Sequence, residues 1–300
     1  MKIAVTTPSG HVGSAVTDFL LDFVGDIQVK LLARRPKDLD KFVQRGAELV
    51  IGPQDDADYL VSATQDVDAL FWVTPPGYGS DNLRAFQNRL GVAGSFAIRA
   101  NHIPRVVNLS SIGAQLSSGV GPICGLYDVE GLLDEAAGNI THLRPGFFFE
   151  NFLMQLESIT KWRRISLPIS GSRTFPMIAA RDVGRVAAVR LVDPTWTGMY
   201  IRELHGPADL SFDEAAEIIS QVLGRKILYI RSDKQEARHV LLNTGMSENL
   251  ADSLLEMYDA VAMGRLQPLQ PRSLESTTPT TLTEFVHEVM LPLIAQPVGR

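Results

Sequence analysis

A glycine-containing turn follows the first apolar run of the chain, at residues 2–6, and comes directly before an amphipathic stretch. Gly10 allows the backbone to approach a diphosphate closely, and Gly13 allows a helix to pack against the preceding strand. The first amides of that helix are free donors at the positive end of its dipole. Hydroxyl groups of Thr7 and Ser9 can add further donors. The predicted phosphate site comprises Thr7, Ser9, Gly10, His11, Val12 and Gly13.

A basic pair ends the second apolar run. The sequence there is Ala33-Arg34-Arg35-Pro36, at the point where dinucleotide-binding folds contact the adenosine ribose. An acidic residue would bind the 2′-hydroxyl, whereas the planar fork of an arginine fits a 2′-phosphate. The pattern favours NADP(H) over NAD(H). The alternative to a phosphate-binding role is that both arginines are simply solvated.

These residues need a parallel sheet to position them. Short apolar runs alternate with helical stretches over the first 150 residues, which is typical of strands joined by crossover helices. Strands are expected at 2–6, 27–33, 47–51, 69–74, 105–109 and 141–144. Helices are expected at 14–23, 36–45, 56–64, 82–100 and 127–137. We therefore expect an α/β fold with a doubly wound parallel Rossmann sheet.

The remainder of the chain predicts a smaller, mostly helical region. A helix is expected at 152–162, short strands at 165–175, a helix at 181–191 begun by Asp182 or a neighbour, and a returning sheet strand at 199–204. The run Ser211-Phe-Asp-Glu214 predicts a capping box, and Gly224 a helix end. Further helices are expected from Ser247 to Gly264 and over 282–290. The expected domains are an NAD(P)-binding domain at 1–150, with 176–206 returning to it, and a C-terminal substrate region at 151–175 and 207–300.

Composition narrows the possible partners. The net charge of −6 argues against a nucleic-acid surface, and no apolar run is long enough for a membrane span. Cys124 is the single cysteine and the six histidines are scattered, so no metal site is expected. We expect a cytoplasmic protein that binds no nucleic acid and no membrane.

Several motifs together resemble the NmrA-like proteins, a family of atypical short-chain dehydrogenase/reductases. The resemblance covers most of the chain, including a C-terminal part similar to bacterial NAD(P)H-binding, quinone-reductase-like members and to ergot-alkaloid-type reductases. It rests on the turn at 6–13, the strand end at 32–34, and the segments 67–76, 108–114, 143–151 and 222–227. The segment Leu143-Arg144-Pro145-Gly146-Phe-Phe-Phe-Glu150-Asn151 is the most specific of these motifs.

This resemblance implies a role for each matching position. Gly10 and Gly13 would hold the diphosphate, and Arg34 the 2′-phosphate. Thr74 and Pro75 would border a cofactor ribose, and Ser110 and Ser111 would lie near the nicotinamide ribose. Pro145 through Phe148, with Phe147 among them, would form the wall of the nicotinamide pocket.

The chain also departs from the family pattern. Thr7 stands where the family usually has its first glycine, which leaves the course of the turn open. Active extended members carry Tyr-x-x-x-Lys before the helix that contains Glu130, and those places hold Pro122 and Leu126. Tyr127 is a candidate proton donor, but Gly131 follows it at the lysine spacing, and residues 42–160 contain no lysine.

Two functions fit this combination. Without the catalytic pair, an alkoxide formed from a simple ketone has no assigned proton donor. A quinone, iminium or enone needs no strong acid, so the first hypothesis is an NADPH-dependent reductase of such a soft electrophile, bound under the C-terminal helices. The alternative is a non-catalytic NADP(H) redox sensor that acts through a regulatory protein partner. The aromatic run Phe147–Phe149 with Phe152 could line the substrate pocket or form core, and His205 is a weaker catalytic candidate.

Overall fold

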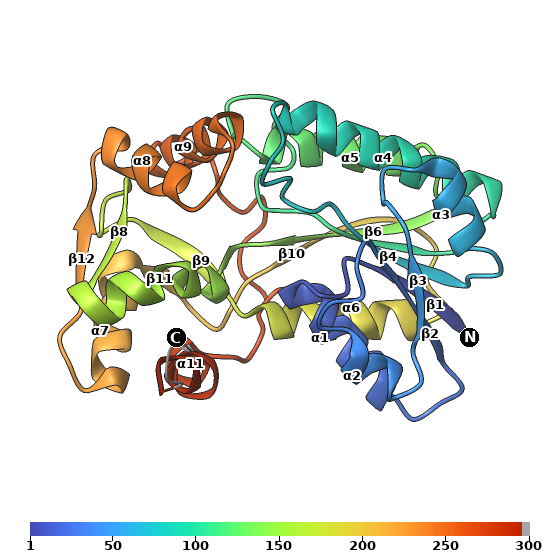
Figure 1. Cartoon of the computed structure of the whole chain (residues 1–300), viewed down its shortest axis with the longest axis horizontal. Helices are drawn as coiled ribbons and strands as arrows, with labels where there is room; N and C mark the ends of the chain where they lie inside the picture. Colours follow the sequence, from blue (N-terminus) through green and yellow to red (C-terminus); the bar gives the residue numbers. More distant parts are fainter. Residues whose placement is uncertain (296–300) are drawn as a thin grey trace.

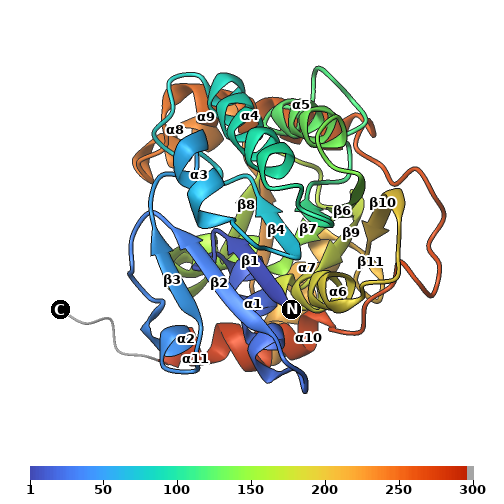
Figure 2. The same cartoon turned by 90° about the vertical axis from the view of Figure 1, so that its right-hand side faces the viewer.

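The main body of the protein is a seven-stranded sheet in which every strand pairing is parallel. The computed structural model describes residues 1–295, with strand order β10-β6-β5-β4-β1-β2-β3 (Figure 2). The strands are β1 (Lys2–Thr6), β2 (Gln28–Ala33), β3 (Glu48–Ile51), β4 (Ala69–Val73), β5 (Val106–Leu109), β6 (Asn139–Pro145) and β10 (Gly198–Leu204). The order reverses between β1 and β4, where doubly wound sheets bind ligands. The predicted Rossmann-type α/β fold, with its returning strand, is confirmed.

Helices cover both faces of this sheet, as its almost continuously apolar strands require. Figure 1 shows one group on each side of the sheet. One face carries α1 (His11–Asp22), α2 (Asp40–Val43) and α6 (Ala180–Val192); the other carries α3 (Ala57–Ala63), α4 (Leu83–Ala100) and α5 (Ile123–Asp134). Among residues 1–295, no helix has the length and apolar character needed to cross a membrane.

The C-terminal elements gather at the end of the molecule away from the N-terminus (Figure 1). They form a three-stranded sheet in the order β11-β9-β7 and a parallel pair of β8 with β12. The strands are β7 (Phe147–Phe148), β8 (Arg164–Leu167), β9 (Thr174–Ile178), β11 (Asp209–Ser211) and β12 (Leu228–Arg231). The helical segments are η1 (Phe149–Gln155), η2 (Ser158–Trp162), α7 (Phe212–Leu223), α8 (Lys234–Asn243), α9 (Glu248–Ala262), α10 (Leu282–Phe285), η3 (Val286–Met290) and α11 (Leu291–Ala295). The C-terminal region was predicted to extend to residue 300, and its last five residues, 296–300, lie outside the described part.

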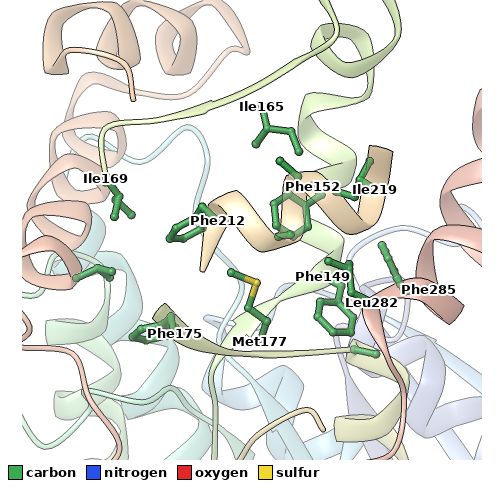
Figure 3. Packing of buried hydrophobic residues seen from close by; sticks show 14 of the residues in the cluster. Phe149, Phe152, Ile165, Ile169, Phe175, Met177, Phe212, Ile219, Leu282 and Phe285 are labelled. Atoms are coloured by element: carbon green, nitrogen blue, oxygen red, sulfur yellow. The ribbon is translucent and has the colours of Figure 1, made fainter. Parts of the chain in front are cut away.

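A shared apolar core joins these elements to one another. Phe149 and Phe152 from η1, Phe212 from α7 and Phe285 from α10 are all buried in it. Figure 3 shows their rings gathered around Met177 of β9. Burial of these large aromatic rings stabilises the packing of η1, α7 and α10 against one another.

The predicted helix ends in the C-terminal part are confirmed. Ser211 and Glu214 form a reciprocal capping box, and Gly224 ends α7 with φ +63°. The Ser247 side chain caps α9 by accepting from the Leu250 amide. Thr281 forms a second capping box at the start of the last helical segment. Short-range hydrogen bonds of this kind are readable from sequence because both partners lie within one turn.

Other expectations for the elements are wrong. The helix expected at 36–45 is reduced to Asp40–Val43, because Asp38 has φ +65° and interrupts it. Helix α5 begins four residues earlier than expected, with Pro122 at its N-cap. The segment expected as one helix over 152–162 is a 3₁₀ and a π segment. Strands β11 and β12 were not expected at all.

Candidate functional site

The predicted phosphate turn leads from β1 into α1 and leaves the helix start uncapped. The Gly10 amide donates to the Thr7 carbonyl at 3.1 Å, and the Ser14 amide opens the helix by donating to the Gly10 carbonyl at 2.7 Å. Within residues 1–295, no side chain caps this end, and no acidic residue lies in its first turn. The positive end of the α1 dipole therefore faces the turn without a protein anion.

The two glycines of the turn have different surroundings. A Cβ on Gly13 would lie 2.2 Å from the Thr7 carbonyl oxygen, so this glycine lets α1 pack directly on the turn. Among the described residues, a Cβ on Gly10 would meet only Thr7 atoms, both at 3.4 Å, which is an ordinary contact distance. The protein itself therefore does not require a glycine here, whereas close approach of a diphosphate to the backbone would.

Thr7 does not offer its hydroxyl to this space. The residue has φ +52°, and its Oγ1 donates to Oε1 of Gln54 at 3.2 Å. Ser9, two residues further on, is exposed, and its hydroxyl has no hydrogen-bond partner among the described residues. The Thr7 hydroxyl is thus engaged within the protein, and donation from Ser9 to a phosphate stays a prediction. Gln54 is a neighbour that the sequence pattern did not identify.

Arg34 follows the last residue of β2, next to the end of β1. The strand register pairs Leu32 with Thr6, which brings the residues after these strands to the same edge of the sheet. The Arg34 side chain is exposed, and within the described residues its guanidinium has no hydrogen bond or ion pair. It is therefore available to an anion from solvent.

The ends of β4 and β5 supply the next group of predicted contacts. Thr74 Oγ1 accepts from the indole nitrogen of the buried Trp72 at 3.2 Å, and Pro75 follows it. The Ser110 amide donates to the Leu143 carbonyl at 2.8 Å. The Ser110 hydroxyl is buried and has no hydrogen-bond partner among the described residues. A buried polar group without a partner is uncommon and fits a group that binds a ligand.

Ser111 and Pro145 complete this edge of the sheet. Ser111 Oγ donates to the Ile112 carbonyl at 3.1 Å, and the Ile112 amide donates to the Pro145 carbonyl at 3.1 Å. The loop after β5 is thereby tied to the end of β6. Thr74, Ser110 and Pro145 thus lie at the ends of three neighbouring strands, β4, β5 and β6.

The aromatic run after Gly146 is mostly core. Phe147 is partly buried and makes an edge contact with Phe212, with ring centroids 5.4 Å apart. Phe149 and Phe152 are each 1% exposed, so they do not line an open pocket in this structure. Of these residues, Phe147 is the one at the boundary between the main sheet and the C-terminal region.

No acid–base pair is assembled near the turn by the residues that the sequence singled out. Pro122 is the N-cap of α5, Leu126 packs against the C-terminal core, and Tyr127 is 42% exposed on the same helix. His205 is buried after β10, and burial lowers its pKa, with the nearby Arg272 adding to the effect. Neither ring nitrogen of His205 has a partner among the described residues.

Two acidic residues of the family-like motifs have positioning roles instead. Glu130 on α5 receives Nε and Nη2 of Arg144 at 2.9 and 2.5 Å, and both side chains are buried. The Glu150 carboxylate accepts from the Ala180 amide at 3.0 and 3.1 Å at the start of α6. Burial raises the pKa of Glu150 to about 7.

Glu150 replaces the helix cap expected from Asp182. The N-cap of α6 is Ala179, which has no side-chain cap. Asp182 lies inside the first turn and accepts from the amide and hydroxyl of Thr280 at 2.9 and 2.7 Å. The prediction for Asp182 was wrong because both of these contacts connect segments far apart in the sequence.

A cavity of about 240 Å³ lies under α9, at the N-terminal ends of α4 and α5. Arg84, Gln87, Cys124, Asn249 and Glu256 are among its lining residues. Both helices follow strands whose ends carry predicted cofactor contacts. The cavity is therefore on the same side of the sheet edge as those contacts, beneath the C-terminal helices.

The chain is similar to proteins whose names refer to NAD(P)H, NADPH or NADP. The chain is 28% identical over 256 residues to an NAD(P)H azoreductase of Xenophilus azovorans, covering 85% of this chain and 86% of the relative. An NADPH complex of quinone oxidoreductase QOR2 from Escherichia coli has a TM-score of 0.79 at 21% identity, covering 96% and 99% of the two chains. An NADP complex of NmrA, a negative transcriptional regulator, has a TM-score of 0.73 at 17% identity, covering 97% and 96%.

A profile of the NmrA-like family matches residues 1–287. This range includes the phosphate turn, the seven-stranded sheet and nearly all of the C-terminal region. The chain belongs to the NmrA-like family.

Proposed function

We propose that this protein is an NADP(H)-dependent oxidoreductase that reduces a soft electrophile such as a quinone, an iminium or an enone. The observation that carries the proposal is the uncapped start of α1, together with Gly10 and with Arg34, whose guanidinium has no ion pair among residues 1–295. These groups offer backbone donors, a helix dipole and a guanidinium to one multiply charged ligand. The azoreductase and quinone oxidoreductase relatives support the same class of reaction.

The residues present fit a dinucleotide in extended form across the sheet edge. The amides of residues 11–13, with Ser9 and the close backbone approach at Gly10, would bind the diphosphate, and Arg34 would bind the 2′-phosphate. Thr74 and Pro75 would border a ribose, and the unpartnered hydroxyl of Ser110 would take a second ribose or amide contact together with Ser111. Pro145 and Phe147 would limit the nicotinamide side, where the bound cofactor supplies a hydride.

The choice of acceptor follows from the missing acid. Pro122 and Leu126 occupy the places of the tyrosine and lysine, and Tyr127 points from an exposed position of α5. A quinone gives a stabilised anion on reduction and an iminium loses its charge, so neither requires a strong proton donor. Positioning of the acceptor would then supply most of the catalysis. The cavity under α9 supports substrate entry beneath the C-terminal helices.

The domain division follows from this assignment. Residues 1–150, with 176–206 returning to the sheet, would hold the cofactor, and residues 151–175 and 207–300 would cover the substrate. The NADP complex of the NmrA regulator favours one second candidate, a protein that binds NADP(H) and signals redox state to a protein partner. The absent Tyr/Lys pair suits that candidate too.

One paired experiment tests the function. Calorimetric titration with NADPH and NADH measures binding, and NADPH oxidation is followed with quinones, iminium dyes and enones. We expect micromolar NADPH binding and turnover well above the rate without protein. Binding without turnover of any acceptor, combined with a redox-dependent change of partner, would replace the reductase by the sensor. No binding of either nicotinamide cofactor would remove both.

A further inference from the structure

We propose that Gln54 is a positioning residue that holds the phosphate turn in its binding geometry through Thr7. The inference rests on the proposed dinucleotide binding and adds a residue that no motif identifies. Gln54 lies between β3 and α3 and is half-buried. Its side-chain amide bonds to residues at two strand ends, Thr7 after β1 and Val73 of β4.

Thr7 is the reason that the turn needs support. It has φ +52°, a conformation that favours glycine and costs a β-branched residue on the order of 1 kcal/mol or more. This conformation directs the Thr7 carbonyl so that it receives the Gly10 amide and packs against Gly13. A return of Thr7 to negative φ would move that carbonyl and turn the amides of the phosphate site away.

Gln54 supplies contacts that oppose this return. Its Oε1 accepts from Thr7 Oγ1 at 3.2 Å, and its Nε2 donates to the Val73 carbonyl at 2.7 Å. The amide group thus joins the end of β1 to the end of β4, the two strands between which the sheet order reverses. The Val73 amide in turn donates to Thr6 Oγ1 at 2.8 Å, so the residue before Thr7 is held to the same strand.

A consequence for ligand binding follows. The Thr7 hydroxyl bonds within the protein, and the Gly10 amide is held by the Thr7 carbonyl. The main-chain amides of residues 11–13 then bind the diphosphate in a turn that is set before the ligand arrives. Preorganisation of this kind raises affinity by removing an ordering cost from binding. Loss of Gln54 should therefore appear in dinucleotide affinity and only weakly in the rate of a bound complex.

A double-mutant cycle tests the proposal on the full chain. Gln54→Ala should weaken NADPH binding about ten-fold, as expected for two hydrogen bonds, raise the KM for NADPH by a similar factor and leave kcat within about two-fold. Thr7→Gly removes the positive-φ strain, so Gln54→Ala in that background should weaken binding by less than about three-fold. Gln44 is an exposed glutamine at the C-cap of α2. Gln44→Ala is the matched control and should bind like the wild type.

A second measurement needs no ligand. Hydrogen exchange at the Gly10 amide, which donates to the Thr7 carbonyl, should be about ten-fold faster in Gln54→Ala than in Gln44→Ala. Equal affinities for these two variants, or losses that add independently of Thr7→Gly, would overturn the role of Gln54. If the wild type binds no dinucleotide, the proposed function fails, and unchanged exchange at Gly10 would separately reject the turn-positioning role.

Discussion

The carbonyl oxygen of Thr7 lies 2.2 Å from the position that a Cβ on Gly13 would take, closer than real Cβ contacts allow. Gly13→Ala should therefore push α1 away from the turn and lower the free energy of unfolding by about 1–3 kcal/mol. Gly131→Ala is the matched control, because this glycine is also helical and a Cβ there would meet no atom of residues 1–295 within 4 Å. Urea denaturation measures both variants. Equal or greater stability of Gly13→Ala would show that the close contact is wrong.

Gly10 gives the opposite expectation. Its backbone has φ −76° and ψ 161°, which valine adopts readily, and the protein leaves room for its Cβ. Gly10→Val should keep the melting temperature of the wild type but lose NADPH affinity by more than about 100-fold, roughly 2.7 kcal/mol, because the side chain enters the proposed diphosphate space. Thermal unfolding and calorimetry report the two quantities. Unchanged affinity would mean that the diphosphate binds elsewhere.

Arg34 is the residue that we propose distinguishes the two nicotinamide cofactors. Arg34→Ala should weaken NADPH binding by about 10–100-fold, the range of a charge-assisted hydrogen-bonded contact, and change NADH binding by less than about three-fold. Arg35→Ala removes an adjacent exposed charge and controls for general electrostatic attraction. Calorimetric titrations at one fixed salt concentration give the four ratios. Equal losses for both cofactors would contradict the 2′-phosphate assignment.

The buried pair Glu130–Arg144 holds α5 to β6. Both side chains are less than 10% exposed, so Glu130→Ala would leave a buried guanidinium without its carboxylate. We expect a loss of about 3–5 kcal/mol in unfolding free energy. The double variant Glu130→Leu/Arg144→Met should recover much of this loss, because no charge is then left unpaired. A single variant that costs under about 1 kcal/mol would show that the pair is not closed in solution.

Local signals made much of the fold predictable. The strands of the main sheet are apolar runs separated by turns, and the caps at Ser211, Ser247 and Thr281 depend on partners within one helical turn. The errors arise where local conformation is unusual or the partner is distant. Asp38 interrupts a helix by a positive φ, and Pro122 begins α5 a full turn before the apolar pattern suggests.

The candidate site shows the same division. The positions of Gly10, Gly13 and Arg34 could be predicted, since each is defined by its place just after a strand. Gln54 could not, because its bonds reach Thr7 over 47 residues and Val73 over 19. Glu150 was visible in a motif, but its contact with Ala180 spans 30 residues. The sequence pattern therefore identified the candidate ligand contacts, whereas the residues that support them could be identified only from the fold.

Glu150 makes stability depend on pH. Burial is the main cause that raises its pKa from 4.5 to about 7, and the charge of Asp182 acts in the same direction, whereas the Ala180 amide and Arg181 oppose it. Because the folded-state pKa is raised, the stabilising contribution is complete below about pH 4.5 and is lost as the pH rises through 7. The loss amounts to about 3 kcal/mol at most.

Glu150→Gln keeps an acceptor for the Ala180 amide and removes the titration. The free energy of unfolding of the variant, minus that of the wild type, should therefore increase between pH 5 and pH 8. Urea denaturation over this range measures it, and parallel curves for the two proteins would mean that Glu150 stays ionised in the folded state without penalty.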